Sequence, residues 1–260
     1  MARITEGDCY AAFYDRDPVR ELPFLQRLTR AYELPERLRV LDVGCGTGRL
    51  LRPLASLGWD VVGMEPHPHY VAMSRTVASD LPGKIDVVAG GFGDLEGVGE
   101  FDLVVAIGDP WWYLLTVDER ADALARAHSS LRPGGVIFLD GPNLDWILEH
   151  YRTPTPSEVR HQGVLIRRSP RHEIDRQGRV WTHVDTFTVA ETGEEVSTVH
   201  RFAIVSIEEI TTALASVGFD DVRTYPSWAA LSPAPPEGSR ILVAARRPSP
   251  CGPDTDSPWP

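Results

Sequence analysis

The sequence predicts an α/β protein with a doubly wound, mostly parallel seven-stranded sheet and an antiparallel β insertion after the fifth strand. Apolar runs alternate with helical patterns at the spacing of repeated βα units over residues 39–140. The run at 101–106 (FDLVVA) is apolar enough for burial on both faces, as in the interior of a parallel sheet. After residue 150 the sequence becomes rich in β-branched and aromatic residues, which is typical of antiparallel strands.

The parallel part of the sheet is expected to contain five strands with short apolar runs, at residues 39–43, 60–64, 85–88, 101–106 and 136–140. Helical patterns lie between them at residues 49–58, 68–80 and 118–131. The sequence Arg-Pro-Gly-Gly at 132–135 predicts a turn into the fifth strand.

The C-terminal part is expected to add antiparallel strands and one helix. Strands at 180–189 and 196–204 flank a turn at 191–194. Ser206 and Glu209 have the spacing of a capping box, which predicts a helix that ends at Gly218. Two further strands, at 221–225 and 240–245, are expected to close the fold as a hairpin.

The chain of 260 residues is long enough for one continuous core. We divide it into an N-terminal helical lid (1–36), a cofactor-binding core (37–143) and an insertion that could cap the substrate (144–204). A C-terminal segment that completes the core (205–247) and a disordered tail (248–260) follow. The tail carries five prolines and no periodicity.

The composition argues against several classes of partner. A formal net charge of −11 disfavours nucleic acid as a partner. The sequence has no apolar run of 18 residues, so it predicts no membrane-spanning helix. The acidic N-terminus lacks a secretory signal, and Cys9, Cys45 and Cys251 are too few and too scattered for a disulfide frame or a metal site. We therefore expect a cytoplasmic protein without a bound metal. The sequence does not decide between a monomer and a homodimer.

A glycine-rich turn at 40–48 (VLDVGCGTG) is the strongest motif. Glycines there let the backbone turn tightly and approach a ligand closely. Glu65 follows Gly44 by 21 residues, at the end of the next strand, where a carboxylate can accept hydrogen bonds from ribose hydroxyls. The alternatives are a plain structural turn and a nicotinamide dinucleotide site. A nicotinamide dinucleotide site typically has the spacing G-x-G-x-x-G, whereas the glycines here are spaced G-x-G-x-G. Asp42 would repel a diphosphate and suits an amine and a sulfonium, which favours S-adenosylmethionine.

This motif resembles motif I of the class I S-adenosylmethionine-dependent methyltransferases, which have a Rossmann-like fold. The resemblance covers about residues 10–247, with the Leu-Arg-Pro-Gly-Gly turn at 131–135 and the sequence ASVGF at 215–219 in the family's order. Within the family, the chain is similar to the small-molecule group that includes glycine/sarcosine and amino-sugar N-methyltransferases. Members of that group carry an antiparallel insertion after the fifth strand, which residues 144–204 match.

The resemblance implies a set of cofactor-binding residues: Asp42, Gly44, Cys45, Gly46, Gly48, Glu65, Pro66, Gly91, Phe92, Ile107 and Gly108. The glycines of motif I would line the methionine part of S-adenosyl-L-methionine, and Glu65 would hold its ribose. The family's adenine-contacting aspartate falls on Gly91, so the Phe92 ring and nearby backbone would have to replace it. Asp94 is either a solvated loop carboxylate or, after a shift of the loop, an adenine contact.

The acceptor site is expected around the loop 108–113, at the carboxyl end of the fourth strand. Asp109 is the first candidate for a general base or an amine anchor. Trp111 and Trp112 either bind substrate or pack under the following helix, and Asn143 lies close enough in the fold to touch substrate.

Other candidates come from the lid and the insertion. Tyr14, and with less support Tyr10, either covers the cofactor or belongs to the packing face of an amphipathic helix. His183, and similarly His200, faces the site if the insertion forms a cap; otherwise this face packs on the sheet or on a second subunit. The cluster at Arg167, Arg168 and Arg171 is either a solvated strand edge or a grip for an anionic substrate.

The resemblance therefore implies methyl transfer from S-adenosylmethionine to nitrogen or oxygen of a small molecule, in an in-line displacement that needs no metal. A secondary metabolite would be a suitable acceptor. The alternatives are a nicotinamide-dependent oxidoreductase and a cofactor-binding module without catalytic activity.

Overall fold

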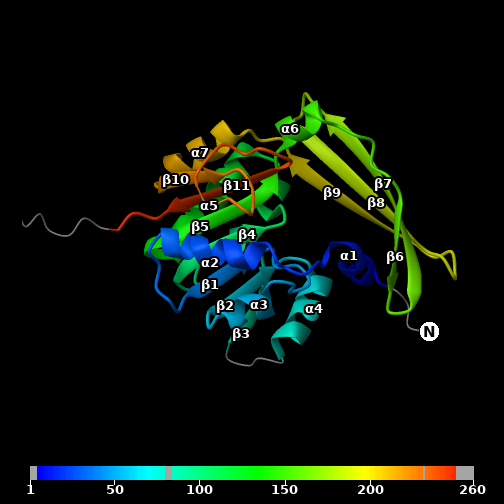
Figure 1. Cartoon of the computed structure of the whole chain (residues 1–260), viewed down its shortest axis with the longest axis horizontal. Coiled ribbons are helices and arrows are strands. Elements are labelled where there is room, and N and C mark those ends of the chain that lie inside the picture. Colours follow the sequence, from blue (N-terminus) through cyan, green and yellow to red (C-terminus); the bar gives the residue numbers. More distant parts are fainter. Residues whose placement is uncertain (1–4, 80–83, 231, 250–260) are drawn as a thin grey trace, which may run out of the picture.

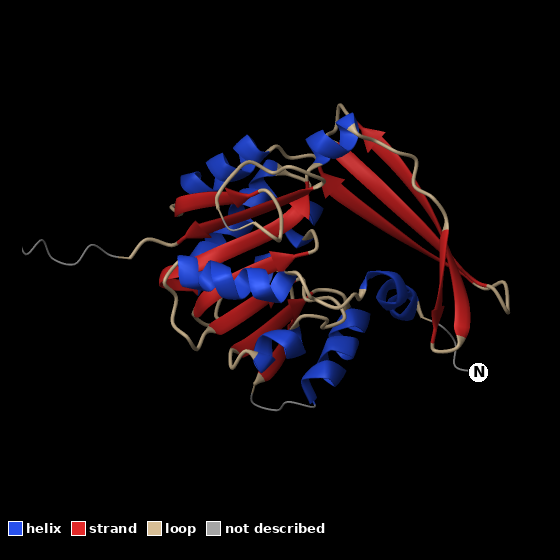
Figure 2. Ribbon diagram, viewed as in Figure 1, coloured by secondary structure: helices blue, strands red, loops and turns tan. Residues whose placement is uncertain are grey.

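Two β-sheets of different kinds organise the chain (Figure 1; Figure 2). The computed structural model describes residues 5–79, 84–230 and 232–249, so Cys251 and positions 250–260 of the expected tail lie outside the described residues. The larger sheet has seven strands in the order β10-β11-β5-β4-β1-β2-β3, and the smaller one has four strands in the order β6-β7-β8-β9. The expected fold class is confirmed.

The parallel strands of the larger sheet are β1 (Arg39–Val43), β2 (Asp60–Glu65), β3 (Ile85–Ala89), β4 (Phe101–Ile107) and β5 (Leu131–Pro142). The antiparallel strands β11 (Arg240–Arg246) and β10 (Asp220–Tyr225) extend it beyond β5. The chain runs outward from β1 to β2 and β3, and then returns to place β4 on the other side of β1. Connections diverge at this point, so a ligand crevice is expected at the carboxyl ends of β1 and β4.

Helices cover both faces of this sheet, at α2 (Glu21–Ala31), α3 (Leu51–Ser56), α4 (Pro68–Ser79), α5 (Val117–Ser130) and α7 (Ile207–Ser216). One core cluster contains Leu124 of α5 and Leu214 of α7, and the other contains Phe24 of α2 and Leu54 of α3. Buried apolar side chains on both faces explain why the strands read as continuous apolar runs. No helix of the described residues is long and apolar enough to cross a membrane.

The smaller sheet follows the short helix α6 (Leu144–Glu149) and consists of β6 (Ser157–His161), β7 (Val164–Asp175), β8 (Val180–Val189) and β9 (Glu195–Ala203). The first helix, α1 (Glu6–Tyr14), lies between α4 and this sheet (Figure 1). Cys9 of α1 packs with Ile166 of β7 and Phe187 of β8 in a small separate core cluster.

Three expectations about local structure require comment. The capping box at Ser206 and Glu209 is confirmed. The prediction of a turn at 132–135 is wrong. These residues belong to β5, and the backbone of Gly134 and Gly135 pairs with that of Arg247. Strands β6 and β7 were not expected, because charged residues alternate along β7 (RRSPRHEID) and hide the apolar pattern.

The last point overturns the expectation that the arginine cluster lies at a strand edge. Strand β7 is bonded to β6 on one side and to β8 on the other, so it is an interior strand. Arg167 and Arg171 are solvent-exposed, whereas Arg168 is largely buried and bonds to Asp185.

The packing of Trp112 on β5 generates a stability prediction. A Cβ added at Gly141 would overlap the Trp112 ring, so Gly141→Ala should destabilise the protein by about 1–3 kcal/mol through overpacking. Gly93→Ala is the matched control, since a Cβ there meets no atom within 4 Å. Urea unfolding of both variants measures the effect. Equal free energies of unfolding for the two variants would show that Trp112 is not packed this tightly.

Candidate active site

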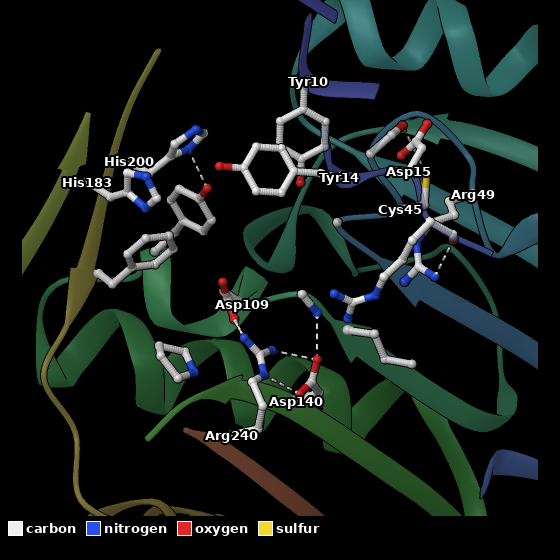
Figure 3. Close-up of a pocket in the computed structure, with 18 of the residues that line it drawn as sticks. Tyr10, Tyr14, Asp15, Cys45, Arg49, Asp109, Asp140, His183, His200 and Arg240 are labelled. Atoms are coloured by element: carbon white, nitrogen blue, oxygen red, sulfur yellow. Dashed lines mark hydrogen bonds and ion pairs between the residues drawn. The ribbon is translucent and has the colours of Figure 1, made fainter. Parts of the chain in front are cut away.

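A cavity of about 350 Å³ opens at the carboxyl edge of the larger sheet, beneath α1 and the inner face of the smaller sheet (Figure 3). Such a volume lies within the range of small-molecule sites. Its walls include the glycine loop after β1, the loop after β4, helix α1, strands β8 and β9, the end of β5 and the start of β11. Expected residues that line it are Tyr14, Asp42, Gly44, Cys45, Gly46, Ile107, Gly108, Asp109 and His183.

The three glycines of the loop have different surroundings. The N–H groups of Gly44 and Cys45 both donate to the Met64 carbonyl, which fixes the loop to β2. A Cβ at Gly44 would meet Pro110 at 2.6 Å, and one at Gly48 would lie 3.1 Å from the Cα of Ser74. A Cβ at Gly46, with φ of +58°, would meet no atom within 4 Å. Gly46 therefore presents open backbone to a ligand, whereas Gly48 is outside the cavity lining and serves close packing of the loop on α4.

Glu65 connects the glycine loop to β2. One carboxylate oxygen accepts the Gly46 N–H at 2.9 Å, and the other accepts the His67 N–H at 2.9 Å. Burial raises the pKa of Glu65, and these two N–H donors oppose the rise. A carboxylate offers about four lone-pair positions, so two remain for hydroxyls of a bound ribose.

The region expected to hold adenine is only partly as predicted. Gly91 lies beside Pro66, where an added Cβ would be 3.9 Å from the proline ring. Phe92 is wrong as a ligand contact, because its ring is 5% exposed and belongs to the apolar core under α5. Asp94 accepts the Gly91 N–H at 2.9 Å and so caps the 3-10 turn η1 (Phe92–Asp94).

Charged residues of both signs lie at the end of the cavity opposite the region expected to hold adenine. Asp42 is 1% exposed, and burial raises its pKa to about 7. Asp15, at the end of α1, accepts a hydrogen bond from the Thr47 hydroxyl at 2.6 Å. Arg49 lines the same end and pairs with the buried Glu21 at 3.2 Å. Sequence reasoning missed Asp15 and Arg49, since neither belongs to a recognisable motif.

Asp109 lies at the floor of the cavity and is part of an ion-pair network. Its φ of +80° is in the left-handed region, and it precedes the 3-10 turn η2 (Pro110–Tyr113). Arg240 contacts Asp109 Oδ1 at 2.6 Å and also binds both carboxylate oxygens of Asp140. Burial raises the pKa of Asp109, and the charge of Arg240 opposes the rise. The lining residues Asp140 and Arg240 were both missed by the sequence analysis.

The structure does not bring Trp111, Trp112 and Asn143, which were expected to bind substrate, into the lining of the cavity. Trp111 is 1% exposed and donates its indole N–H to the Arg120 carbonyl of α5, and Trp112 is fully buried. The side chain of Asn143 caps α6 and donates to the Gly238 carbonyl at 2.9 Å. These are structural contacts. Of the three aromatic residues in this loop, Tyr113 is the one that lines the cavity, because the 3-10 turn directs successive side chains to different sides.

Tyr14 and His183 meet at Asp185 of β8, a carboxylate that is fully buried. The Tyr14 hydroxyl donates to one Asp185 oxygen, and the other lies 2.8 Å from Arg168 Nε and 3.0 Å from His183 Nε2. Burial alone would raise the pKa of Asp185, but the hydrogen bonds from His183 and Tyr14 and the charge of Arg168 lower it to about 2. Asp185 is therefore an anion that holds Tyr14 and His183 in place.

His200 forms a second polar contact in the upper part of the cavity. Its Nδ1 lies 2.6 Å from the Tyr113 hydroxyl, and its Nε2 is buried without a hydrogen-bond partner (Figure 3). Burial lowers the pKa of His200, so the neutral imidazole is favoured. His183 and His200 lie directly opposite one another on β8 and β9. Among the described residues, no three His, Cys, Asp or Glu side chains gather in a metal-binding arrangement.

These residues fit an adenosyl amino acid that carries a sulfonium. The backbone at Gly46 is open, Glu65 has acceptors for a ribose, and carboxylates and arginine at the other end match an ammonium and a carboxylate. A switch-point crevice with this donor set defines an S-adenosylmethionine-binding α/β enzyme.

Comparison with known proteins identifies the family. A family model described as a methyltransferase domain matches residues 40–135. A ubiquinone biosynthesis O-methyltransferase of Cereibacter sphaeroides is 30% identical over 198 residues, which cover 67% of this chain and 72% of that protein. A shorter match spans 41% of the same-named protein of Azorhizobium caulinodans. The chain belongs to the S-adenosylmethionine-dependent methyltransferases, and the nicotinamide alternative is not favoured.

Two other relatives match over more of the chain. A dTDP-3-amino-3,4,6-trideoxy-alpha-D-glucopyranose N,N-dimethyltransferase of Streptomyces venezuelae is 27% identical over 226 residues, covering 84% of this chain and 91% of that protein. The structure of S-adenosylmethionine-bound CalS10, an amino pentose methyltransferase of Micromonospora echinaspora involved in calicheamicin biosynthesis, has a TM-score of 0.71 and 27% identity. That match covers 95% of this chain and 99% of CalS10.

The contacts of Glu65 predict its effect on cofactor binding. Glu65→Ala removes the acceptors for the Gly46 and His67 N–H groups, so affinity for S-adenosylhomocysteine should fall at least about tenfold. Asp86→Ala, at an exposed carboxylate of the neighbouring strand β3, is the control and should bind normally. Calorimetric titration measures both. Wild-type affinity in the Glu65 variant would remove this residue from the cofactor site.

The raised pKa of Asp42 predicts a pH-dependent stability. Between the unfolded value near 3.8 and the folded value of about 7, the folded state keeps a proton that the unfolded state has lost. Stability therefore falls as pH rises through this window and levels off above it. Asp42→Asn removes this loss, so its stability relative to wild type should increase from pH 4 to pH 8. Urea unfolding curves that stay parallel across this range would contradict the assignment.

Proposed function

We propose that this enzyme methylates the amine nitrogen of a small amino sugar. The observation that carries the proposal is the acceptor end of the cavity, where the acid Asp109 faces two histidines, His183 and His200. An aliphatic amine is a cation at neutral pH and must lose a proton before its lone pair can attack. A site that both attracts a cation and takes up a proton suits such an acceptor. Two relatives that match over most of the chain act on amino sugars by name.

Asp109 and the surrounding rings would bind the acceptor amine. The Asp109 carboxylate lies between Arg240 and the open space below Tyr14 (Figure 3). Around that space lie the aromatic residues Tyr10, Tyr14, Tyr113, Trp181 and Phe202. Aromatic faces attract an ammonium group by about 0.5–2 kcal/mol, and this attraction adds to that of the carboxylate.

His183 would accept the proton of the amine. Its Nε2 lies 3.0 Å from Asp185, so the carboxylate can hold the ring and stabilise the imidazolium after proton transfer. Asp185 is a positioning residue, because it is fully buried and does not itself line the cavity. General base catalysis of this type contributes about 10²–10⁴-fold.

S-adenosylmethionine, when bound, supplies an electrophilic methyl group on its sulfonium sulfur. The chain's own contribution is to hold the acceptor nitrogen in line with that methyl group and to exclude water. Helix α1 and the smaller sheet close the cavity from above, and the Tyr14–Asp185 hydrogen bond joins them. Orientation of two reactants at near-attack distance accounts for most of the rate enhancement in a displacement without a covalent intermediate.

The same proposal includes the cellular setting. A net charge of −11 argues against nucleic acid, and a cavity of about 350 Å³ supports a small metabolite as acceptor. Cys9 and Cys45 are buried free thiols, which supports a reducing compartment such as the cytoplasm. A homodimer would leave the inner face of the smaller sheet to the cavity and use other surfaces.

The experiment is methyl transfer from radiolabelled S-adenosylmethionine to a panel of amino sugars, catechols and neutral sugars. We expect label on nitrogen of an amino sugar and none on phenolic oxygen. Label on a catechol oxygen alone would overturn the proposed acceptor.

His183→Gln gives the second arm. Turnover should fall about 10²–10⁴-fold, while affinity for S-adenosylhomocysteine stays unchanged. Thr182→Ala, on the opposite face of β8, is the control. Wild-type turnover in the His183 variant would exclude His183 as the base.

A further inference from the structure

Arg168 is the member of the arginine cluster that contacts residues of the active site. It belongs to β7, and 19% of its side chain is exposed, whereas 60% of the neighbouring Arg167 is exposed. The Arg168 guanidinium lies 2.8 Å from Asp185, 3.2 Å from His183 and over the ring of Tyr14, 5.4 Å from the ring centroid. No step of the proposed methyl transfer uses this cation directly.

The Nε2 atom of His183 has two neighbours with opposite requirements. Asp185 Oδ1, at 3.0 Å, can only accept while the carboxylate is ionised, so this contact needs a hydrogen on Nε2. Arg168 Nη2, at 3.2 Å, can only donate, so that contact needs a lone pair on Nε2. A neutral imidazole can satisfy only one of the two neighbours, and the choice decides which ring nitrogen carries the hydrogen.

Burial favours the contact with Asp185. This carboxylate is fully buried, so a lone pair of His183 turned toward it would be repelled without relief from water. The Arg168 side chain is partly exposed, so water is available to it. His183 therefore carries its hydrogen on Nε2 and keeps a lone pair on Nδ1. The His183 ring lies in the wall of the cavity, and its Nδ1 is unburied and makes no hydrogen bond within the described residues (Figure 3).

This arrangement requires Asp185 to remain an anion. Tyr14 is a neutral donor, and His183 must be neutral to accept a proton, so Arg168 is the partner of Asp185 whose charge is permanent. A buried carboxyl without a cationic partner tends to take up a proton instead. A protonated Asp185 would donate to Nε2, and the hydrogen of the imidazole would then lie on Nδ1. The nitrogen open to the cavity could no longer act as a base.

We propose that Arg168 is a positioning residue for methyl transfer, which holds Asp185 as an anion and so fixes the hydrogen of His183 on Nε2. Nδ1 then receives the proton of the acceptor amine, while the electron pair of that N–H bond stays on the amine nitrogen. The resulting imidazolium still donates from Nε2 to Asp185. The use of Nδ1 rests on the proposed function, whereas the position of the hydrogen is a property of the protein alone.

The test is NMR of the nitrogen-15-labelled full chain saturated with S-adenosylhomocysteine, at about pH 8.5, where histidines are ordinarily neutral. The nitrogen chemical shift separates a ring nitrogen that bears hydrogen from one that bears a lone pair. His183→Gln assigns the signals of His183 among the eight histidines. We expect the hydrogen on Nε2 in wild type. Arg168→Met should move it to Nδ1 and lower turnover about 10²–10⁴-fold, the range for loss of a general base.

Two further variants separate the charge of Arg168 from its packing. Arg168→Lys keeps a cation at this position, so the hydrogen should stay on Nε2 and turnover should recover most of the loss seen in Arg168→Met. Arg167→Met is the matched control, because Arg167 pairs with Glu158 on the opposite face of β7. This variant should equal wild type in both measurements.

The outcomes separate this inference from the proposed function. A hydrogen on Nδ1 in wild type, or on Nε2 in both wild type and Arg168→Met, overturns the positioning role even if an amino sugar is methylated. A hydrogen that moves with the charge of residue 168 supports the role even if no amine in the panel accepts methyl, which would overturn the proposed acceptor alone. The wild-type spectrum keeps the inference falsifiable if Arg168→Met fails to fold.

Discussion

The ion pairs of Arg240 hold the acceptor side of this enzyme together. Its guanidinium lies between Asp109 and Asp140, and Asp140 also accepts the Gly108 N–H at 3.0 Å. These contacts tie β11, β5 and the loop after β4 into one unit. A non-glycine residue in the left-handed region costs of the order of 1–3 kcal/mol, so Asp109 keeps its φ of +80° only because its surroundings fix it. Without this cation two buried carboxylates would repel one another.

The larger sheet by itself would provide half of a site. It presents the glycine loop, Glu65 and Asp42 at one edge, and these are the groups expected to hold the cofactor. Of the groups proposed to handle the acceptor, Asp109 follows β4 of the larger sheet, whereas His183 is added by the smaller sheet and Tyr14 by α1. Asp185 is the point where these two parts meet, since it binds Tyr14 of α1, Arg168 of β7 and its own neighbour His183. A buried anion with this many donors rigidifies a region that would otherwise be a peripheral sheet.

The cofactor half of the site was predictable from sequence because its determinants are local. The glycine loop, Asp42 and Glu65 lie within one βαβ unit, and periodicity defines the strands on either side. Phe92 was predicted to contact adenine, but its ring packs in the core under α5. This packing is a tertiary contact, which no local sequence pattern reveals.

The acceptor half depends on contacts between residues far apart in sequence. Arg240 reaches Asp109 across the sheet, and Tyr14 reaches Asp185 in another sheet. Charged residues alternate along β7, and the arginine cluster there was expected at a solvated strand edge, so the interior position of Arg168 was not predicted. In the loop after β4, composition predicted aromatic residues at the site but not which ones. The 3-10 geometry of η2 buries Trp111 and Trp112 and leaves Tyr113 at the cavity.

Helix α1 touches both halves of the site at its C-terminal end. Tyr14 bonds to the smaller sheet, and the adjacent Asp15 bonds to Thr47 of the glycine loop. A displacement of this one short helix would therefore disturb both compartments together. A ligand that displaced α1 from one compartment would change the affinity of the other, and by linkage the two effects on affinity would be equal.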